Sequence, residues 1–165
     1  LRELDLGFNT IPVLTTNFDN GLAQLEWLSL AGNIINEVQL DVLGNLTEIK
    51  HLDLSQNDLR RLTPGVFRPS LTKLRKLNLS RNKISSLTVS ELSTMTSLKL
   101  LDLSDNRLTA LESPLFEPIK KGLELQFKGN VRKRKYFFHF SLSSFHPYKV
   151  RKPERPKTEE KKDLV

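Results

Sequence analysis

The chain has 165 residues, enough for one domain and a tail, and its composition excludes several classes of protein. It contains no cysteine, which excludes disulfides, thiolate catalysis and cysteine-ligated metal sites. No apolar run of about 18 residues is present, so no transmembrane helix is visible. The net charge of +7 lies entirely in residues 131–165, because residues 1–130 contain 15 basic and 15 acidic side chains. The charge therefore gives no reason to expect that residues 1–130 bind nucleic acid.

Five successive stretches, beginning at residue 1, follow the template L-x-x-L-x-L-x-x-N-x-[LI]-x-x-[LV]. The repeats start near residues 1, 25, 49, 74 and 98, and a partial sixth starts near 122. A fixed period of this length indicates a solenoid, in which each repeat packs only on its neighbours. The sequence opens in register, without a polar cap or a signal peptide, so we expect a fragment of a longer chain.

Within each repeat, leucines at positions 4 and 6 alternate with other residues, which indicates a short strand with one buried face. The returning half carries a second apolar column of Leu22, Leu46, Leu71, Met95 and Ile119, and Phe67 and Phe116 are expected in the same core. Position 9 is an asparagine whose amide can bond turn backbone that would otherwise be buried and unpaired. The predicted ladder consists of Asn9, Asn33, Asn57, Asn82, Asn106 and Asn130.

On this template, residues 1–130 resemble the typical 24-residue class of leucine-rich repeats. That class is common in animal ectodomains such as Toll-like receptors, neuronal adhesion proteins and matrix proteoglycans. The resemblance implies a curved, right-handed solenoid of α/β type, with a parallel sheet on the concave face and short helices or turns on the convex side. It also implies non-enzymatic protein recognition by a cell-surface or secreted receptor, adhesion or matrix protein. The cysteine-rich caps usual in such ectodomains are absent from this sequence.

Positions 3 and 5 are expected to form two rows across the concave face, because neighbouring strands lie about 4.8 Å apart. Trp27, the only tryptophan, is predicted to point outward, and exposed tryptophans are enriched among binding hot spots. The alternative is that Trp27 folds flat over its neighbours. Small residues at position 7 would let a partner approach closely. The predicted contacts with a protein ligand are Trp27, His51, Asp53, Lys76, Asn78, Leu100 and Asp102.

Nothing in the sequence predicts an enzyme, a cofactor or a small-molecule substrate. Ser29, His51 and Asp53 would project into solvent, whereas a catalytic triad needs a base oriented by a buried carboxylate and a nearby oxyanion hole. The three histidines have no metal-ligand spacing, and no phosphate-binding glycine-rich loop appears.

Two N-glycosylation sequons occur, Asn45-Leu46-Thr47 and Asn78-Leu79-Ser80. Asn45 is expected on the returning half, where a glycan is tolerable if the chain is secreted. Asn78 is expected on the concave face, where a glycan would obstruct binding, so only Asn45 is taken as a glycosylation candidate.

The template ends after Asn130, and residues 131–165 form a basic, aromatic and then Lys/Glu/Pro-rich tail that is expected to be largely disordered. Four interpretations of the tail stay open. Residues 136–148 cap the last repeat, the segment binds an anionic membrane surface, it serves nuclear localisation or nucleic-acid binding, or it is a non-native terminus from an alternative transcript. The alternative function is accordingly a cytoplasmic adaptor whose tail binds anionic membrane or nucleic acid.

Overall fold

The structure is a computed structural model that describes residues 1–15, 19–40, 42–62, 66–67, 71–87, 92, 95–109 and 122–131. The expectations for Phe116, Ile119 and residues 132–165 lie outside the described residues.

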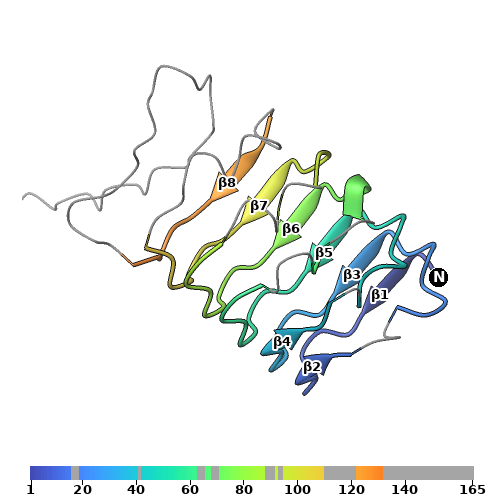
Figure 1. Ribbon diagram of the computed structural model, residues 1–165, viewed down its shortest axis with the longest axis horizontal. Helices are drawn as coiled ribbons and strands as arrows, with labels where there is room; N and C mark the ends of the chain where they lie inside the picture. The colour runs from blue at the N-terminus through green and yellow to red at the C-terminus, as the bar shows by residue number, and fades with distance from the viewer. Residues whose placement is uncertain are drawn as a thin grey trace, which may run out of the picture.

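Six short parallel strands form the main sheet, one from each repeat (Figure 1). They are β1 (Glu3–Asp5), β3 (Trp27–Ser29), β5 (His51–Asp53), β6 (Lys76–Asn78), β7 (Leu100–Asp102) and β8 (Glu124–Gln126). The strands lie in the sheet in their chain order, and each pair joins equal template positions, as in Leu28↔Leu52 and Leu52↔Leu77. The sequence prediction of a parallel-sheet solenoid is therefore confirmed.

The central leucine of each strand points into the core, because successive side chains of a strand face opposite sides of the sheet. Leu28, Leu52 and Leu77 are almost completely buried, and the leucines two residues further on are buried as well. The residues that flank the central leucines are half-buried or exposed, with the exception of Ser29. The side of the sheet that faces away from the core is called the sheet face below.

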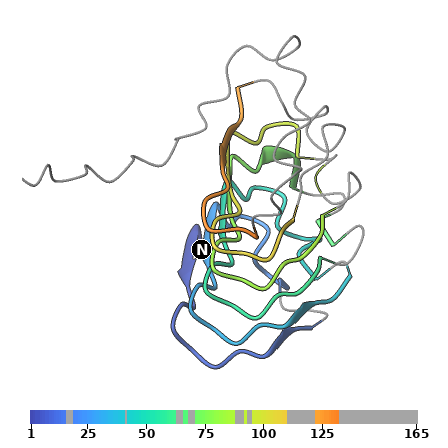
Figure 2. The ribbon, with the colours of Figure 1, turned by 90° about the vertical axis from the view of Figure 1, so that its left-hand side faces the viewer.

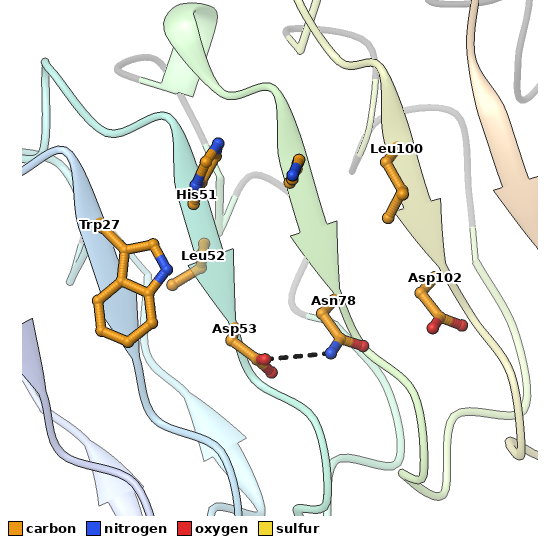
Figure 3. Close-up of a pocket in the computed structure, with 8 residues that line it drawn as sticks. Trp27, His51, Leu52, Asp53, Asn78, Leu100 and Asp102 are labelled. Atoms are coloured by element: carbon orange, nitrogen blue, oxygen red, sulfur yellow. Dashed lines mark hydrogen bonds between the residues drawn. The ribbon is translucent and has the colours of Figure 1, made fainter.

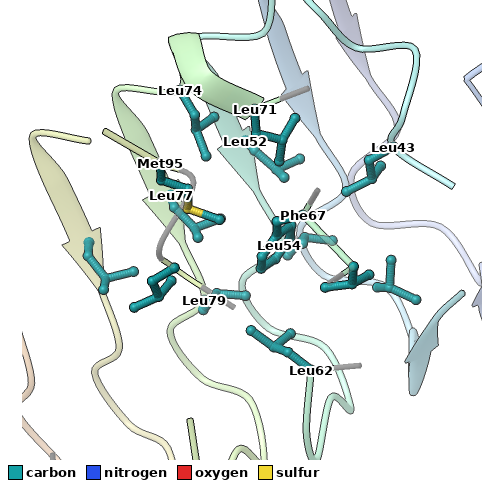
Figure 4. Close-up of a cluster of buried hydrophobic side chains, with 14 of the residues drawn as sticks. Leu43, Leu52, Leu54, Leu62, Phe67, Leu71, Leu74, Leu77, Leu79 and Met95 are labelled. Atoms are coloured by element: carbon teal, nitrogen blue, oxygen red, sulfur yellow. The ribbon is translucent and has the colours of Figure 1, made fainter. Parts of the chain in front are cut away.

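The returning half of each repeat consists mainly of turns, with one short 3-10 helix, η1 (Leu71–Lys73), in the described part of the chain. Figure 4 shows Phe67 among the core leucines, beside Leu54, and Met95 near Leu77. Phe67 and Met95 are 1% and 0% exposed. The prediction of turns and a second apolar column on the convex side is therefore confirmed where the chain is described.

A second, smaller sheet was not expected from the sequence. It pairs β2 (Val13–Leu14) with β4 (Glu37–Val38) in parallel, where the first two repeats begin their return. Figure 2 shows the repeats stacked as successive coils, with the main sheet on one side. Every repeat therefore presents its strand residues on the same face.

Candidate functional site

The asparagine at position 9 ties each repeat to the one before it. Asn57, which is 5% exposed, donates from Nδ2 to the carbonyls of Leu30, Leu54 and Ser55 at 2.9, 3.1 and 3.0 Å. Its Oδ1 accepts the backbone N–H of Ile35 at 2.9 Å. Four further asparagines also bond both the preceding repeat and the turn to which they belong: Asn33, Asn82, Asn106 and Asn130. Asn9 is exposed and bonds only its own turn.

The aspartates and the asparagine at position 5 of the template have a structural role that was not predicted from the sequence. Asp5, Asp53 and Asp102 each accept, through Oδ1, the backbone N–H two residues further on at 2.8 Å. Asn78 makes the same turn with the N–H of Ser80 at 3.1 Å. Aspartate or asparagine followed two residues later by glycine or serine was the available signal, because such side chains cap turns in this way.

Position 8 adopts a left-handed backbone in all six repeats, which was also missed. The φ angle is +55° for Phe8 and Gln56 and +67° for Gly32, and the remaining members are Arg81, Asp105 and Gly129. A Cβ on Gly32 would lie 2.6 Å from a ring atom of Phe8, so the ring covers that glycine although Phe8 itself is 79% exposed. The glycines at this position were the sequence signal for a left-handed turn.

A shallow hollow of about 250 Å³ lies on the sheet face across β3, β5, β6 and β7 (Figure 3). Figure 3 shows the Trp27 indole at one side of it and Leu100 and Asp102 at the other, with His51 between them. Leu52 lies at its floor, and Asn78 donates to Oδ2 of Asp53 at 3.1 Å. The structure therefore brings together all seven residues that the sequence proposed as partner contacts: Trp27, His51, Asp53, Lys76, Asn78, Leu100 and Asp102.

Parts of the two polar rows are less accessible than expected. Ser29 was expected to face solvent, but it is only 7% exposed. Ala31 and Ser55, two of the small residues at position 7, are likewise buried, at 9% and 4% exposed. Position 7 lies just after the strand, between the strand and the asparagine of the ladder. No hydrogen bond joins Ser29, His51 and Asp53 in the described structure.

Partial burial and nearby positive charges both act on the imidazole of His51 in the hollow. Partial burial of the imidazole is the main cause that lowers the pKa of His51 from its ordinary value of 6.5. The positive charges of Lys76, Arg75 and Lys50 lower it further. Lys50 itself donates to Glu26 at 2.5 Å, and this hydrogen bond, helped by Arg2, lowers the pKa of Glu26.

The sequon asparagine Asn45 lies on the returning half and is exposed. Its backbone N–H and its Nδ2 donate to the two carboxylate oxygens of Asp19 at 2.6 and 3.1 Å. Asp19 is 2% exposed, so its charge is satisfied by this pair of hydrogen bonds. Asn78, by contrast, lies inside the hollow with both ends of its side-chain amide bonded.

Within the described ranges, no group of three or more histidine, aspartate or glutamate side chains is placed to hold a metal ion. The same ranges contain no helix that is long and apolar enough to cross a membrane.

Comparison with known proteins places this chain among repeat proteins. It is 39% identical to vasorin of Xenopus tropicalis over 66 residues, which are 40% of this chain and 10% of vasorin. It is 37% identical to osteomodulin of Bos taurus over 68 residues, which are 40% of this chain and 16% of osteomodulin. The chain thus spans a small part of each of these relatives.

Solved structures share the fold over most of the chain. The complex of TLR13 with ssRNA13 matches 78% of this chain and 18% of its own, at 25% identity and a TM-score of 0.73. The complex of Drosophila Toll with Spatzle matches 78% of this chain and 19% of its own, at 21% identity and a TM-score of 0.72. The sequence model of the family described as leucine rich repeat matches residues 1–59, 23–72, 52–108 and 72–127. Together these matches span residues 1–127, and the chain therefore belongs to the leucine-rich repeat family.

Proposed function

We propose that the chain is a non-enzymatic recognition module whose protein partner docks on the sheet face, over the hollow beside Trp27. The observation that carries this proposal is the hollow itself, which gathers an aromatic ring, an apolar side chain and charged groups from four neighbouring strands. Tryptophan is enriched among the residues that contribute most of the binding free energy at protein interfaces. The resemblance to receptor, adhesion and matrix ectodomains supports the same role.

A protein partner fits the sheet face better than a nucleic acid. The six strands of the sheet carry five acidic side chains and one basic side chain, Lys76. A phosphate backbone would be repelled by such a face, because nucleic-acid affinity comes largely from neutralising phosphates with lysine and arginine. The TLR13 complex contains single-stranded RNA, but the acidic excess on the strands of this chain does not favour the same kind of ligand here.

We propose binding without catalysis because the hollow lacks the groups that a reaction needs. His51 is the only histidine in the described part of the chain, and no hydroxyl or carboxylate is hydrogen-bonded to it there. Nucleophile and base must lie within hydrogen-bond reach of one another in covalent catalysis.

The proposal is tested by displaying the unaltered chain against an array of purified animal extracellular proteins. Trp27→Ala should weaken binding to the interacting protein at least about tenfold and leave thermal stability nearly unchanged, because Trp27 is only half-buried. Leu40→Ala is the matched control, since Leu40 is a 51% exposed apolar residue outside the main sheet. Equal binding by both variants, or no bound protein at all, would contradict the proposal.

We propose that residues 1–130 form the recognition domain and that residues 131–165 are not needed for it. Deleting residues 131–165 should leave the affinity for the array partner unchanged. The adaptor hypothesis expects the opposite result, because there the basic tail makes the contact. In that case the full-length chain would also lose affinity steeply as salt is raised.

We propose a secreted or cell-surface location, with an N-linked glycan on Asn45. A glycosylated amide keeps one N–H, so Asn45 can still donate to Asp19 while the sugar projects outward. After expression in animal cells with a secretion signal, peptide N-glycosidase F should reduce the mass of the chain. Thr47→Val should abolish this change and Ser80→Ala should not. A natural product found unglycosylated in the cytosol would favour the adaptor hypothesis.

A further inference from the structure

The six strands of the sheet face carry more acidic than basic side chains, although Arg75 and Lys50, next to the strands, also act on His51 in the hollow. The carboxylates of the strands are Glu3, Asp5, Asp53, Asp102 and Glu124, and their one ammonium is Lys76. None of these six side chains takes part in an ion pair within the described residues. The ion pairs that are present lie outside the sheet face, as in Lys50–Glu26 and Lys83–Asp58.

We propose that the hollow binds a basic segment of the protein partner, with one arginine or lysine side chain seated between the Trp27 indole and the Asp53 carboxylate. This inference rests on the proposed function and names the chemistry of the partner. Trp27 and Asp53 lie on adjacent strands, because Trp27 pairs with His51 and Ser29 pairs with Asp53. A cation over an indole face is attracted by the negative charge density of the ring face, and a neighbouring carboxylate adds to this attraction.

The carboxylates are held in place before a partner arrives. Oδ1 of Asp53 accepts the N–H of Ser55 at 2.8 Å, and Oδ2 accepts Nδ2 of Asn78 at 3.1 Å. Asp102 is fixed through Oδ1 by the N–H of Ser104 at 2.8 Å, and its Oδ2 has no partner among the described residues. Groups that are already oriented lose little conformational freedom on binding. Asp102, two strands from Asp53 and thus roughly 10 Å away, adds negative potential across the hollow.

Lys76 allows a test of whether the group that binds in the hollow is a cation or an anion. It is exposed, lines the same hollow on β6, and is not ion-paired with Asp53 or Asp102. A cation that enters the hollow is repelled by the Lys76 ammonium, whereas an anion would be attracted. Neutralising Lys76 must therefore strengthen the binding of a basic segment and weaken the binding of an acidic one.

The experiment uses the fluorescence of Trp27, the only tryptophan in the chain. The full chain is titrated with the peptide acetyl-Gly-Arg-Gly-Arg-Gly-amide and, separately, with its glutamate counterpart acetyl-Gly-Glu-Gly-Glu-Gly-amide. The arginine peptide should change the emission of Trp27 in a saturable way, with an affinity that falls as salt is raised. The glutamate peptide should leave the emission unchanged.

The variants exchange aspartate for asparagine, which keeps the turn because Asn78 already makes it. Asp53→Asn should lower the affinity for the arginine peptide about fivefold, and Asp102→Asn should lower it about twofold. Asp5→Asn is the matched control, since Asp5 makes the same 2.8 Å turn contact but does not line the hollow. Lys76→Gln should tighten binding about twofold.

No response of Trp27, an equal response to both peptides, or weaker binding after Lys76→Gln would each overturn the inference. So would an unaltered affinity of Asp53→Asn. These results leave the proposed function standing, provided that Trp27→Ala still loses the array partner. If Trp27→Ala keeps that partner, the proposed function itself fails, whatever the peptides do.

Discussion

At the scale of single residues, four buried asparagines connect the repeats: Asn33, Asn57, Asn82 and Asn106. Each strand has only three residues, so backbone N–H and C=O groups lack strand partners where the chain turns away from the sheet. The asparagine side chain supplies the missing hydrogen bonds. Because the same side chain bonds its own turn and the preceding repeat, it fixes both the turn and the distance between repeats. The cost of losing it should depend on burial and on the bonds to the preceding repeat.

Asn57→Ala should lower the free energy of unfolding by about 3 kcal/mol, because it leaves buried carbonyl and N–H groups without hydrogen-bond partners. Asn9→Ala should cost about 1 kcal/mol or less, because its hydrogen bonds are exposed and local. Urea unfolding followed by circular dichroism measures both values. Equal losses for the two variants would contradict the role given to the bonds between repeats.

His51 should make stability depend on pH. Its pKa in the folded chain is lowered from 6.5, so the unfolded chain binds a proton more readily than the folded chain. Stability is therefore unaffected above pH 6.5 and falls as the pH drops from 6.5 toward the lowered value. His51→Gln should remove this part of the loss when urea unfolding is compared on the two sides of that pH. A variant with the same pH dependence as the unaltered chain would refute this account of His51.

The sequence predicts some of these residues better than others. The asparagine at position 9 follows from the repeat template, and the outward direction of Trp27, His51 and Lys76 follows from strand periodicity. Burial of Ser29 and Ser55 does not, because the alternation of a strand places both on the outward side and carries no information on what packs around them. The turn role of Asp53 was missed because its outward position suggested only a solvent or partner contact.

At the scale of elements, the strands are too short to be stable alone and depend on their neighbours on both sides. Leu77 in β6 is 0% exposed between β5 and β7, whereas Leu4 in the edge strand β1 is half-buried. The same leucine at the same template position thus has two different surroundings.

Leu77→Ala should destabilise the chain by about 3–4 kcal/mol, because it removes a fully buried side chain and leaves a cavity. Leu4→Ala should cost less than about 2 kcal/mol, since water can occupy the space that it leaves. Urea unfolding again supplies the comparison. A loss for Leu4→Ala as large as that for Leu77→Ala would show that the end repeat is packed as tightly as the centre.

The main strands were predictable from the alternation of leucine with other residues, but the second sheet was not. β2 and β4 contain two residues each, and two residues carry no readable period. Their pairing brings Val13 beside Glu37 and follows from the way successive repeats stack on one another.

At the scale of the whole molecule, the solenoid turns sequence positions 24 or 25 residues apart into neighbours in space. The hollow exists only because β3, β5, β6 and β7 are stacked in register. Each of these strands contributes at least one residue to its lining. The template predicts that stacking and therefore predicts which residues share the face. It does not predict the hollow, which depends on the different sizes of Trp27, His51, Lys76 and Leu100 at one template position.

The central claim is that a protein partner occupies the hollow on the sheet face. It is tested most directly by photo-cross-linking to the partner found on the array, with p-benzoylphenylalanine placed either at Leu100 or at Leu40. Leu100 lines the hollow, whereas Leu40 is an exposed apolar residue outside the main sheet. We expect a cross-link from position 100 and none from position 40. A cross-link from position 40 alone would mean that the partner binds elsewhere on the solenoid.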